Sequence, residues 1–394
     1  MINLATFIEM AGAVLLAATV PGTIYLALLT VAGSLPARRT TAGKFTGRIA
    51  LVVPAHNEAS GIRRTIENLL AIVQTDGNAD VVVVADNCSD NTAVIAREAG
   101  ARVMERHDLG RRGKGYALDH AFNTLAREGY AAYIVIDADS LAADNLLSCV
   151  RQHFSGECLA LQTRYTVLNG SETPRTRLAE IALAAFNVLR PRGRDRLGLS
   201  VGILGNGFAL RREVLERIPY TATSVVEDLE YHLKLVAAGI AVEFADDTEI
   251  RGEMPTGEQG SRVQRARWEG GRLRMLVEHA PALIGKILRG KLRFLEPLAD
   301  LMLLPLAYHV ILLLVTLGMS LLVTTGLSVV AIASLGIVCL HTVVAMRVTR
   351  LPLSRLWTLT RVPLYLLWKL RMLATTLAGA ARGSAWIRTD RTGS

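Results

Sequence analysis

The sequence predicts an α/β fold in which a mostly parallel sheet is covered by helices on both faces and joined to about three transmembrane helices. Two observations support this prediction. From residue 49 onward, short apolar runs typical of buried strands alternate with helical stretches, which is the pattern of a parallel sheet with right-handed crossovers. Three other segments are apolar over the length that crosses a bilayer, and 394 residues leave room for both parts.

The first apolar segment covers residues 7–31. A signal peptide is the alternative to a retained membrane anchor, but no basic residue precedes the run, and residues 34–37 make a poor cleavage site. We therefore expect an anchor over residues 1–33, followed by a basic linker over residues 34–48.

The second long apolar segment, residues 301–346, contains no Asp, Glu, Lys or Arg. It is long enough for two transmembrane helices of about 20 residues, with a tight turn near Thr324, Thr325 and Gly326. Residues 283–295 mix basic and apolar side chains, which predicts a helix lying in the membrane interface.

The C-terminal stretch 353–373 has the same mixed character, and a fourth span is its alternative interpretation. The expected division of the chain after the linker is a cytoplasmic domain (49–275), an interfacial helix (276–297), two transmembrane helices (298–347), and an interfacial helix with a tail (348–394).

The formal net charge of +9 suggests an anionic partner. The basic residues, however, flank the apolar segments: Arg38, Arg39, Lys44 and Arg48 follow the first, Lys286, Arg289, Lys291 and Arg293 precede the second, and Arg347 and Arg350 follow the third. By the positive-inside rule these flanks face the cytoplasm, so the soluble domain lies on the cytoplasmic side of the plasma membrane. The charge therefore predicts contact with a lipid bilayer and no nucleic acid partner.

Four cysteines, Cys88, Cys149, Cys158 and Cys339, are scattered without a CxxC pair. This spacing fits a reducing compartment and argues against a zinc site or a disulfide framework. We therefore expect free thiols.

Two carboxylates follow the apolar strand predicted over residues 132–136. Because side chains alternate along an extended backbone, Asp137 and Asp139 should point the same way. In open α/β sheets ligands bind at the carboxyl ends of strands, and paired carboxylates together with substrate phosphates suit Mg²⁺ or Mn²⁺. The alternative is an acid pair that only solvates a turn.

Two earlier strands also end in polar residues. The run 49–55, which includes Pro54, leads to Glu58, and the run 80–85 leads to Asp86. A nucleotide at these strand ends would meet Asp86 and Glu58 on neighbouring loops. No GxGxxG motif follows either strand, which weakens a dinucleotide-binding or dehydrogenase interpretation.

A basic, glycine-containing loop around Lys114 precedes the next predicted helix. Such a loop can present backbone N–H groups and a Lys to phosphate, although the signal is weak in isolation. Its place one helix before the carboxylate pair favours a donor-binding role for Lys114.

The second half of the soluble region is less regular. We expect a strand over 159–165, a helix over 179–189, and a basic patch over 190–196 that contacts lipid headgroups, an anionic acceptor or only solvent. The glycines around Gly205 suggest backbone that passes close to a ligand.

Two acids, Glu227 and Asp228, open a further predicted helix. Acids at a helix N-terminus can simply compensate the helix dipole, or Asp228 can act as a general base. The pattern alone leaves both interpretations open.

Five features in a fixed order resemble the family 2 glycosyltransferases that are anchored in bacterial membranes, a group that includes cellulose, hyaluronan and poly-N-acetylglucosamine synthases. They are the segment 53–58, which includes Pro54 and Glu58, the segment 85–90 with Asp86, the pair Asp137 and Asp139, the pair Glu227 and Asp228, and Gln264, Arg267 and Trp268 in the pattern QxxRW. Each is weak alone, and together they cover residues 49–268.

The resemblance implies a nucleotide-diphospho-sugar transferase fold of the GT-A type, a UDP-sugar donor, and a divalent metal, Mg or Mn, held by Asp139. Asp228 would deprotonate the acceptor hydroxyl, and one base with one displacement implies inversion at the anomeric carbon. The nucleotide would contact Pro54, Glu58, Asp86, Lys114 and Asp137, and the donor diphosphate and the acceptor would contact Gly205, Glu227, Gln264, Arg267 and Trp268. Residues 386–391 resemble a tail motif of some members.

The acceptor implied is lipid-linked or a glycan, in cell-envelope or exopolysaccharide assembly. A membrane part of about three helices favours the addition of one or a few sugars, and processive synthesis of an exported β-polysaccharide is the alternative. Asn87 stands where many relatives carry a second acid. This departure supports a further alternative, a non-catalytic nucleotide-sugar-binding subunit that works with polysaccharide-assembly partner proteins.

Overall fold

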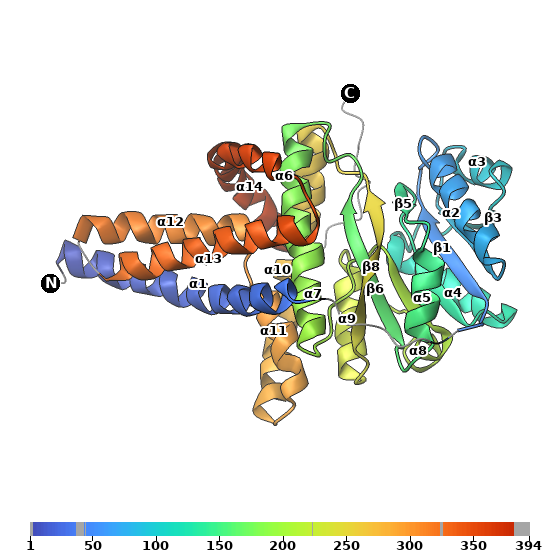
Figure 1. Ribbon diagram of the computed structural model, residues 1–394, viewed down its shortest axis with the longest axis horizontal. Helices are drawn as coiled ribbons and strands as arrows, with labels where there is room; N and C mark the ends of the chain where they lie inside the picture. Colours follow the sequence, from blue (N-terminus) through green and yellow to red (C-terminus); the bar gives the residue numbers. More distant parts are fainter. Residues whose placement is uncertain (1–2, 37–42, 44, 223, 324–325, 382–394) are drawn as a thin grey trace.

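The computed structural model describes residues 3–36, 43, 45–222, 224–323 and 326–381. Figure 1 shows an α/β part on the right and three long helices that extend from it to the left: α1 (Leu4–Ser34), α12 (Leu306–Val323) and α13 (Leu327–Val348). Predicted features outside the described residues are Arg38, Arg39 and Lys44 of the linker, Thr324 and Thr325 of the turn, and the tail motif at 386–391.

The α/β part contains a single eight-stranded sheet within the described residues. Its strands are β1 (Ile49–Ala55), β2 (Ala79–Asp86), β3 (Arg102–Arg106), β4 (Ala132–Val135), β5 (Ser140–Ala142), β6 (Ala160–Val167), β7 (Phe208–Arg211) and β8 (Val242–Gly252). They lie side by side in the order β3-β2-β1-β4-β7-β6-β8-β5.

The sheet is mostly parallel, as the sequence predicted, and contains two strands of opposite direction, β7 and β5. Strands β3, β2, β1 and β4 are parallel as expected. The short strand β7 then runs antiparallel to both β4 and β6, and β5 runs antiparallel to β8. Only four residues make up β7, and an alternation that short could not be recognised in the sequence.

Helices cover both faces of the sheet, as predicted. Alternate residues of β1 point to opposite faces, so that Leu51 and Val53 join one buried cluster and Ala50 and Val52 join the other. The first cluster is closed by α2 (Ile62–Asp76), α3 (Thr92–Glu98) and α5 (Leu146–Phe154). The second is closed by α4 (Lys114–Leu125), α8 (Arg212–Arg217) and α9 (Glu227–Ala237).

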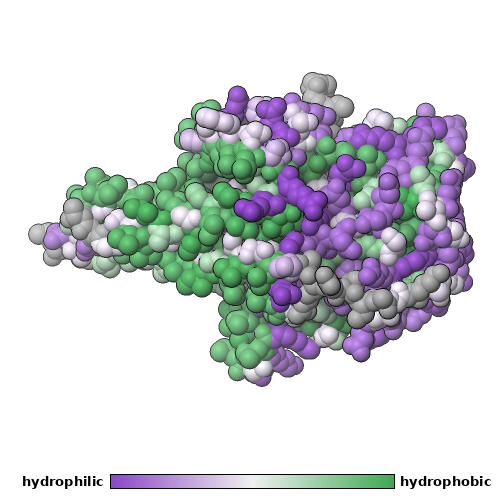
Figure 2. Space-filling model, viewed as in Figure 1, coloured by the Kyte–Doolittle hydropathy of each residue, from purple (hydrophilic) through white to green (hydrophobic). Residues whose placement is uncertain are grey.

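Helices α1, α12 and α13 are each long and apolar enough to cross a membrane. Their outer surface is hydrophobic in Figure 2, in contrast to the hydrophilic surface of the α/β part. They pack on one another through apolar side chains such as Leu16, Leu313 and Val338. Thr23 Oγ1 lies 2.9 Å from His309 Nε2, so these polar side chains are paired inside the bundle and not exposed to lipid.

Two further helices lie between the bundle and the sheet. Helix α10 (Glu258–Leu288) runs without a break through the QxxRW residues, so the expected division between residues 275 and 276 falls inside it. A short turn with η3 (Leu292–Phe294) leads to α11 (Leu295–Met302).

The stretch 353–373 forms the 3₁₀ segment η4 (Leu353–Arg361) and most of α14 (Val362–Ala381). In α14 the buried Lys369 pairs with Glu269 of α10.

A kinked helical segment crosses from the sheet to the bundle. It consists of α6 (Pro174–Leu183), the π-helical η2 (Ala184–Leu189) and α7 (Arg190–Arg196). Helix α7 packs against α1, and the π-helical turn η2 packs against α13.

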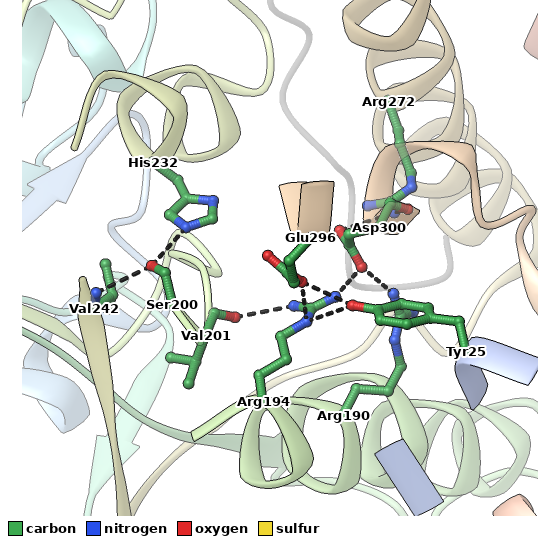
Figure 3. A network of polar contacts seen from close by, with 10 residues as sticks. All are labelled: Tyr25, Arg190, Arg194, Ser200, Val201, His232, Val242, Arg272, Glu296 and Asp300. Carbon is green, nitrogen blue, oxygen red and sulfur yellow. Dashed lines mark hydrogen bonds and ion pairs between the residues drawn. The ribbon is translucent and has the colours of Figure 1, made fainter. Parts of the chain in front are cut away.

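A buried carboxylate at this crossing binds three guanidinium groups (Figure 3). Asp300 of α11 pairs with Arg190 and Arg194 of α7, and its Oδ2 atom lies 2.9 Å from Arg272 of α10. Burial alone would raise the pKa of Asp300, but Arg194, Arg272 and Arg190 outweigh burial and hold this pKa well below its usual range. The carboxylate therefore stays ionised.

The same network reaches the apolar helix α1. Arg194 Nε donates to the hydroxyl of Tyr25 at 2.9 Å and lies 2.6 Å from Glu296 Oε1, and the Tyr25 hydroxyl donates to Glu296 at 2.7 Å. These contacts join α1, α7, α10 and α11 into one unit, which we call the Asp300 cluster after its central residue.

The Asp300 cluster corrects one expectation for the basic patch at 190–196, which could have been a solvated loop. The patch is helical, and Arg190 and Arg194 are each only 6% exposed. The acids that compensate them come from α11, more than a hundred residues later in the chain, which is why the local sequence gave no sign of burial.

Asp300→Asn removes the charge that compensates three buried guanidinium groups. We expect it to lower the free energy of unfolding by about 3–5 kcal/mol, because it leaves uncompensated charge in the interior. Thermal unfolding of the detergent-solubilised protein, followed by tryptophan fluorescence, measures the loss. The matched control is Glu98→Gln, which removes an exposed ion pair with Arg63 and should cost less than about 1 kcal/mol. Equal stabilities of the two variants would contradict this role.

Candidate active site

One cavity of about 900 Å³ opens at the carboxyl ends of β1, β2 and β4. All twelve residues that the sequence singled out contribute to its lining: Pro54, Glu58, Asp86, Lys114, Asp137, Asp139, Gly205, Glu227, Asp228, Gln264, Arg267 and Trp268. They come from strands, loops and helices spread over more than two hundred residues. The fold therefore brings the predicted site residues together.

The two carboxylates after β4 lie in a turn. Strand β4 ends at Val135, and the N–H group of Ser140 donates to the carbonyl of Asp137 at 3.1 Å. The expected alternation along an extended strand is therefore wrong in its geometry, although Asp137 and Asp139 still face the same cavity. The turn is held by the buried Asn206, whose Oδ1 accepts from the Asp137 N–H at 3.1 Å.

Lys114 lies at the start of α4 and reaches the same turn. Its ammonium group pairs with the carboxylate of Asp137 and donates to the carbonyl of Gly205 at 2.6 Å. Burial lowers the pKa of Lys114, but the charges of Asp137 and Glu227 outweigh burial and raise it. Lys114 is therefore a fixed cation between the carboxylate turn and the glycine loop.

Glu227 and Asp228 begin α9 and both line the cavity. Burial raises the pKa of both carboxyl groups, and for Glu227 the neighbouring Asp228 adds to this effect and brings the pKa to about 7. A carboxylate with a raised pKa is a better proton acceptor near neutral pH than an exposed one. Both carboxyl groups thus face the cavity with raised pKa values, a property that a general base at this position would need.

Gly205 approaches Asp228 closely. Its φ angle is +77°, and a Cβ atom placed on it would lie 3.0 Å from Asp228 Oδ2. Both the left-handed backbone and the lack of space require glycine here. The sequence predicted that the backbone at Gly205 passes close to a ligand. In the structure the group that it approaches is the side chain of Asp228.

Asp86, at the end of β2, is held by three neighbours. Arg106 Nη1 donates to its Oδ1 at 2.5 Å, Asn87 Nδ2 donates to the same oxygen at 3.1 Å, and the carbonyl of Asp86 lies 2.7 Å from His56 Nδ1. Asn87 has a φ angle of +51°, a region that Asn tolerates well, and its Oδ1 accepts from the N–H of Asp108 at 2.7 Å. Asn87 thus orients Asp86.

Gln264, Arg267 and Trp268 lie on one face of α10, since residues three and four apart are neighbours on a helix. Trp268 packs against the buried cluster that contains Tyr165 and Met254, and Gln264 is buried. Arg267 forms no ion pair with any residue in the described part of the chain, and its charge opposes the rise in the pKa of Glu227. A cation is therefore available near the acid pair.

Residues 47–271, more than half of the chain, match the family described as "Glycosyltransferase like family 2". This chain belongs to glycosyltransferase family 2. Over 236 residues the transferase is 25% identical to the probable glycosyltransferase YdaM of Bacillus subtilis, which covers 57% of this chain and 55% of that protein. It is 27% identical over 236 residues to the β-monoglucosyldiacylglycerol synthase of Trichormus variabilis, covering 58% of this chain and 50% of that protein. The chain therefore spans about half the length of these curated relatives.

A solved structure shares most of the architecture. The transferase superposes on the mannosyltransferase PcManGT from Pyrobaculum calidifontis, which was solved in complex with GDP-Man and Mn²⁺, with a TM-score of 0.56. The match has 17% sequence identity and covers 92% of this chain and 99% of that chain. The predicted GT-A type fold is confirmed. The likeness to polysaccharide synthases in particular stays a prediction.

Two polar residues of the transferase site were not predicted. Arg106 lies on β3, which the sequence analysis missed, and only the fold brings it to Asp86. Asn206 stands inside the glycine-rich segment that was singled out, and its position between Gly205 and Gly207 was the available signal.

The cavity of the transferase continues beyond these polar groups into an apolar region. Its lining there includes Leu303 and the α12 residues Ala307 and Val310, then Val338 of α13, and Leu366 of α14. A single space thus joins the carboxylates to the helices that are long enough to cross a membrane.

Gly115→Ala tests how tightly the site is packed. In most helix interiors this change stabilises by about 0.5–1 kcal/mol, but here the added carbon would lie 2.0 Å from the carbonyl oxygen of Ala222. We expect a loss of at least about 1–3 kcal/mol in unfolding free energy and a loss of sugar transfer, because α4 must move away from Glu227. Gly61→Ala is the control, since no atom lies within 4 Å of its added carbon. Equal stability and activity of the two proteins would show that α4 has room to move.

Proposed function

We propose that this transferase moves a sugar, with inversion, from a nucleotide-diphosphate donor to a lipid acceptor at the plasma membrane. One observation carries the proposal. The cavity that contains the acid pairs is continuous with an apolar space beside α12 and α13, so a donor and an amphiphilic acceptor can meet in it.

The donor would bind at the sheet end of the cavity. Asp139, with Asp137, offers hard oxygen ligands that suit Mg²⁺ or Mn²⁺ beside a diphosphate, and the metal would neutralise the charge of the leaving group. Lys114 already stands next to this turn, where it can contact phosphate oxygens. Glu58 and Asp86 would contact the nucleoside, for which we favour uridine.

The transfer would be a single displacement. An acceptor hydroxyl oxygen forms a bond to the anomeric carbon, its proton passes to Asp228, and the bond from that carbon to the diphosphate oxygen breaks, which releases the nucleoside diphosphate. Arg267 would stabilise the negative charge that develops on the diphosphate. The attack comes from the side opposite the leaving group, so an α-linked donor yields a β-linked product.

The acceptor would enter from the bilayer. Its acyl or prenyl chains fit the apolar lining around Val310 and Val338, and its headgroup reaches the base at α9. The name of the Trichormus relative, a glucosyldiacylglycerol synthase, supports a lipid substrate. The basic residues that flank the apolar helices support a cytoplasmic site.

Incubation of the purified protein with a panel of UDP- and GDP-sugars, Mn²⁺ and membrane lipid extract should identify a pair that releases nucleoside diphosphate. Asp228→Asn should lower the rate about 10²–10⁴-fold, because it removes the general base. Asp139→Ala should lower the rate at least about 10²-fold and abolish the dependence on added metal. Glu98→Gln is the matched control.

Full activity of Asp228→Asn would exclude Asp228 as the base. Tight donor binding without acceptor-dependent release for any pair would favour the non-catalytic binding subunit instead.

Ala307→Phe tests the acceptor route, because Ala307 lines the apolar part of the cavity. We expect the larger ring to cost about 1–3 kcal/mol of acceptor binding, a roughly 5–150-fold loss in kcat/KM for the lipid, with the affinity for the donor nucleotide unchanged. Val315→Phe, on the exposed side of the same helix, is the control. An unchanged kcat/KM in Ala307→Phe would contradict entry beside α12.

A further inference from the structure

A second group of reactive side chains lies away from the catalytic cavity. The ligand atoms of His153, Cys158 and Glu243 lie within 4.8 Å of one another, and the same is true of Cys149, His153 and Asp247. None of these five residues lines the catalytic cavity. They gather where α5 and the start of β6 meet β8.

The fold aligns this group from segments far apart in the chain. Cys149 and His153 lie one turn apart on α5, so both face β8. Strand β8 has an irregularity there, because Thr163 of β6 opposes Ala245 and the next residue opposes Glu249. The three looped-out residues include Asp247, which is aimed at α5 and accepts from Cys149 Sγ at 2.9 Å.

His153 is buried, with a side chain only 7% exposed. Its Nδ1 atom has no hydrogen-bond partner in the described part of the chain, and the nearest carboxylate oxygen, Glu243 Oε2, is 3.8 Å away. That separation is too long for a hydrogen bond. A buried nitrogen without a hydrogen-bond partner lowers the stability of the folded protein, so a bound ion at this position would be favourable.

We propose that His153 Nδ1, Cys158 Sγ and a Glu243 oxygen bind a zinc ion, with water in the fourth position. Nitrogen, sulfur and oxygen ligands together suit Zn²⁺, whereas Mg²⁺ and Mn²⁺ prefer oxygen alone. Ligand atoms around a tetrahedral zinc are roughly 3.3–3.7 Å apart, close to the separation of His153 and Glu243. On binding, the Cys158 thiol gives its proton to solvent and coordinates as thiolate.

Asp247 and Cys149 would support the zinc ligands. Asp247 Oδ1 lies 3.9 Å from His153 Nε2 and would accept the second ring proton once it approaches to about 3 Å, and Cys149 donates to this carboxylate in turn. A metal-bound imidazole commonly donates its other N–H to a carboxylate in this way. The lack of a CxxC pair argued against a thiol zinc site, but here the three ligands come from α5, the α5–β6 loop and β8.

Zinc at this site would stabilise the fold and would take no part in the proposed sugar transfer. It lies near the first residues of β6 and β8, and these strands run parallel to each other and to β4, whose opposite end carries the carboxylate turn. Zinc would tie the α5–β6 connection to β8, and the free energy of binding would add to that of folding.

Metal analysis of the full-length protein tests the proposal. After chelator treatment and dialysis against buffer containing ZnCl₂, mass spectrometry of the purified protein should find about one zinc per chain. Cys158→Ser and Glu243→Gln should lose at least nine-tenths of it, whereas Cys88→Ser and Asp139→Ala should retain it. Cys149→Ser should weaken zinc binding about 10–100-fold without abolishing it.

Zinc should also raise the thermal unfolding temperature of the wild-type protein and not that of Glu243→Gln. Glu243 is half-exposed, so this variant folds even where a core change at Cys158 does not. A wild-type protein that retains no zinc, or a Glu243→Gln protein that retains as much as wild type, would overturn the site. Neither result bears on sugar transfer, because Asp139 is tested separately.

Discussion

The buried pairing of Asp300 with three arginines is the constraint on which the rest of the structure depends. Taking these charges out of water is expensive, and the interior tolerates them only because each finds its partner. The partners come from α7, α10 and α11, and Tyr25 extends the network to α1. The network therefore ties the apolar helix α1 to the helices that pack beside the sheet domain.

The same cluster also contacts the loop and the helix that line the candidate active site. Arg194 donates to the carbonyl of Val201 at 3.0 Å, and Ser200 Oγ lies 2.8 Å from Nε2 of His232, one turn after Asp228 on α9. Burial, with a smaller contribution from Arg194, lowers the pKa of His232 to about 4, so this imidazole is neutral at pH 7 and adds no charge. The loop that ends at Gly205 thus lies between the arginines of the Asp300 cluster and helix α9, which carries Asp228.

Much of the polar site could be predicted because its chemistry is local in sequence. Asp137 with Asp139, and Glu227 with Asp228, are adjacent acids at the ends or starts of elements, and their order along the chain carries the family signature. The antiparallel β7, the neighbour Arg106 and the burial of Arg190 and Arg194 could not be predicted. Each depends on a partner distant in sequence, such as Asp86 for Arg106 or Asp300 for the two arginines. Amino-acid patterns indicate local secondary structure, whereas these contacts form only when distant segments pack together in the folded protein.

The π-helical turn η2 has a consequence for how this protein can vary. Such a turn accommodates one more residue than an ordinary α-helical turn, and every following side chain is rotated by about 100° about the helix axis. In an unbroken α-helix from Pro174 to Arg196, Arg190 and Arg194 would point away from α11. The extra residue in η2 rotates α7 relative to α6 about the helix axis. Helix α6 can then face its neighbours near the sheet while α7 faces its neighbours near the bundle. Deletion of one residue in η2 would therefore turn Arg190 and Arg194 away from Asp300, although no charged residue had been changed.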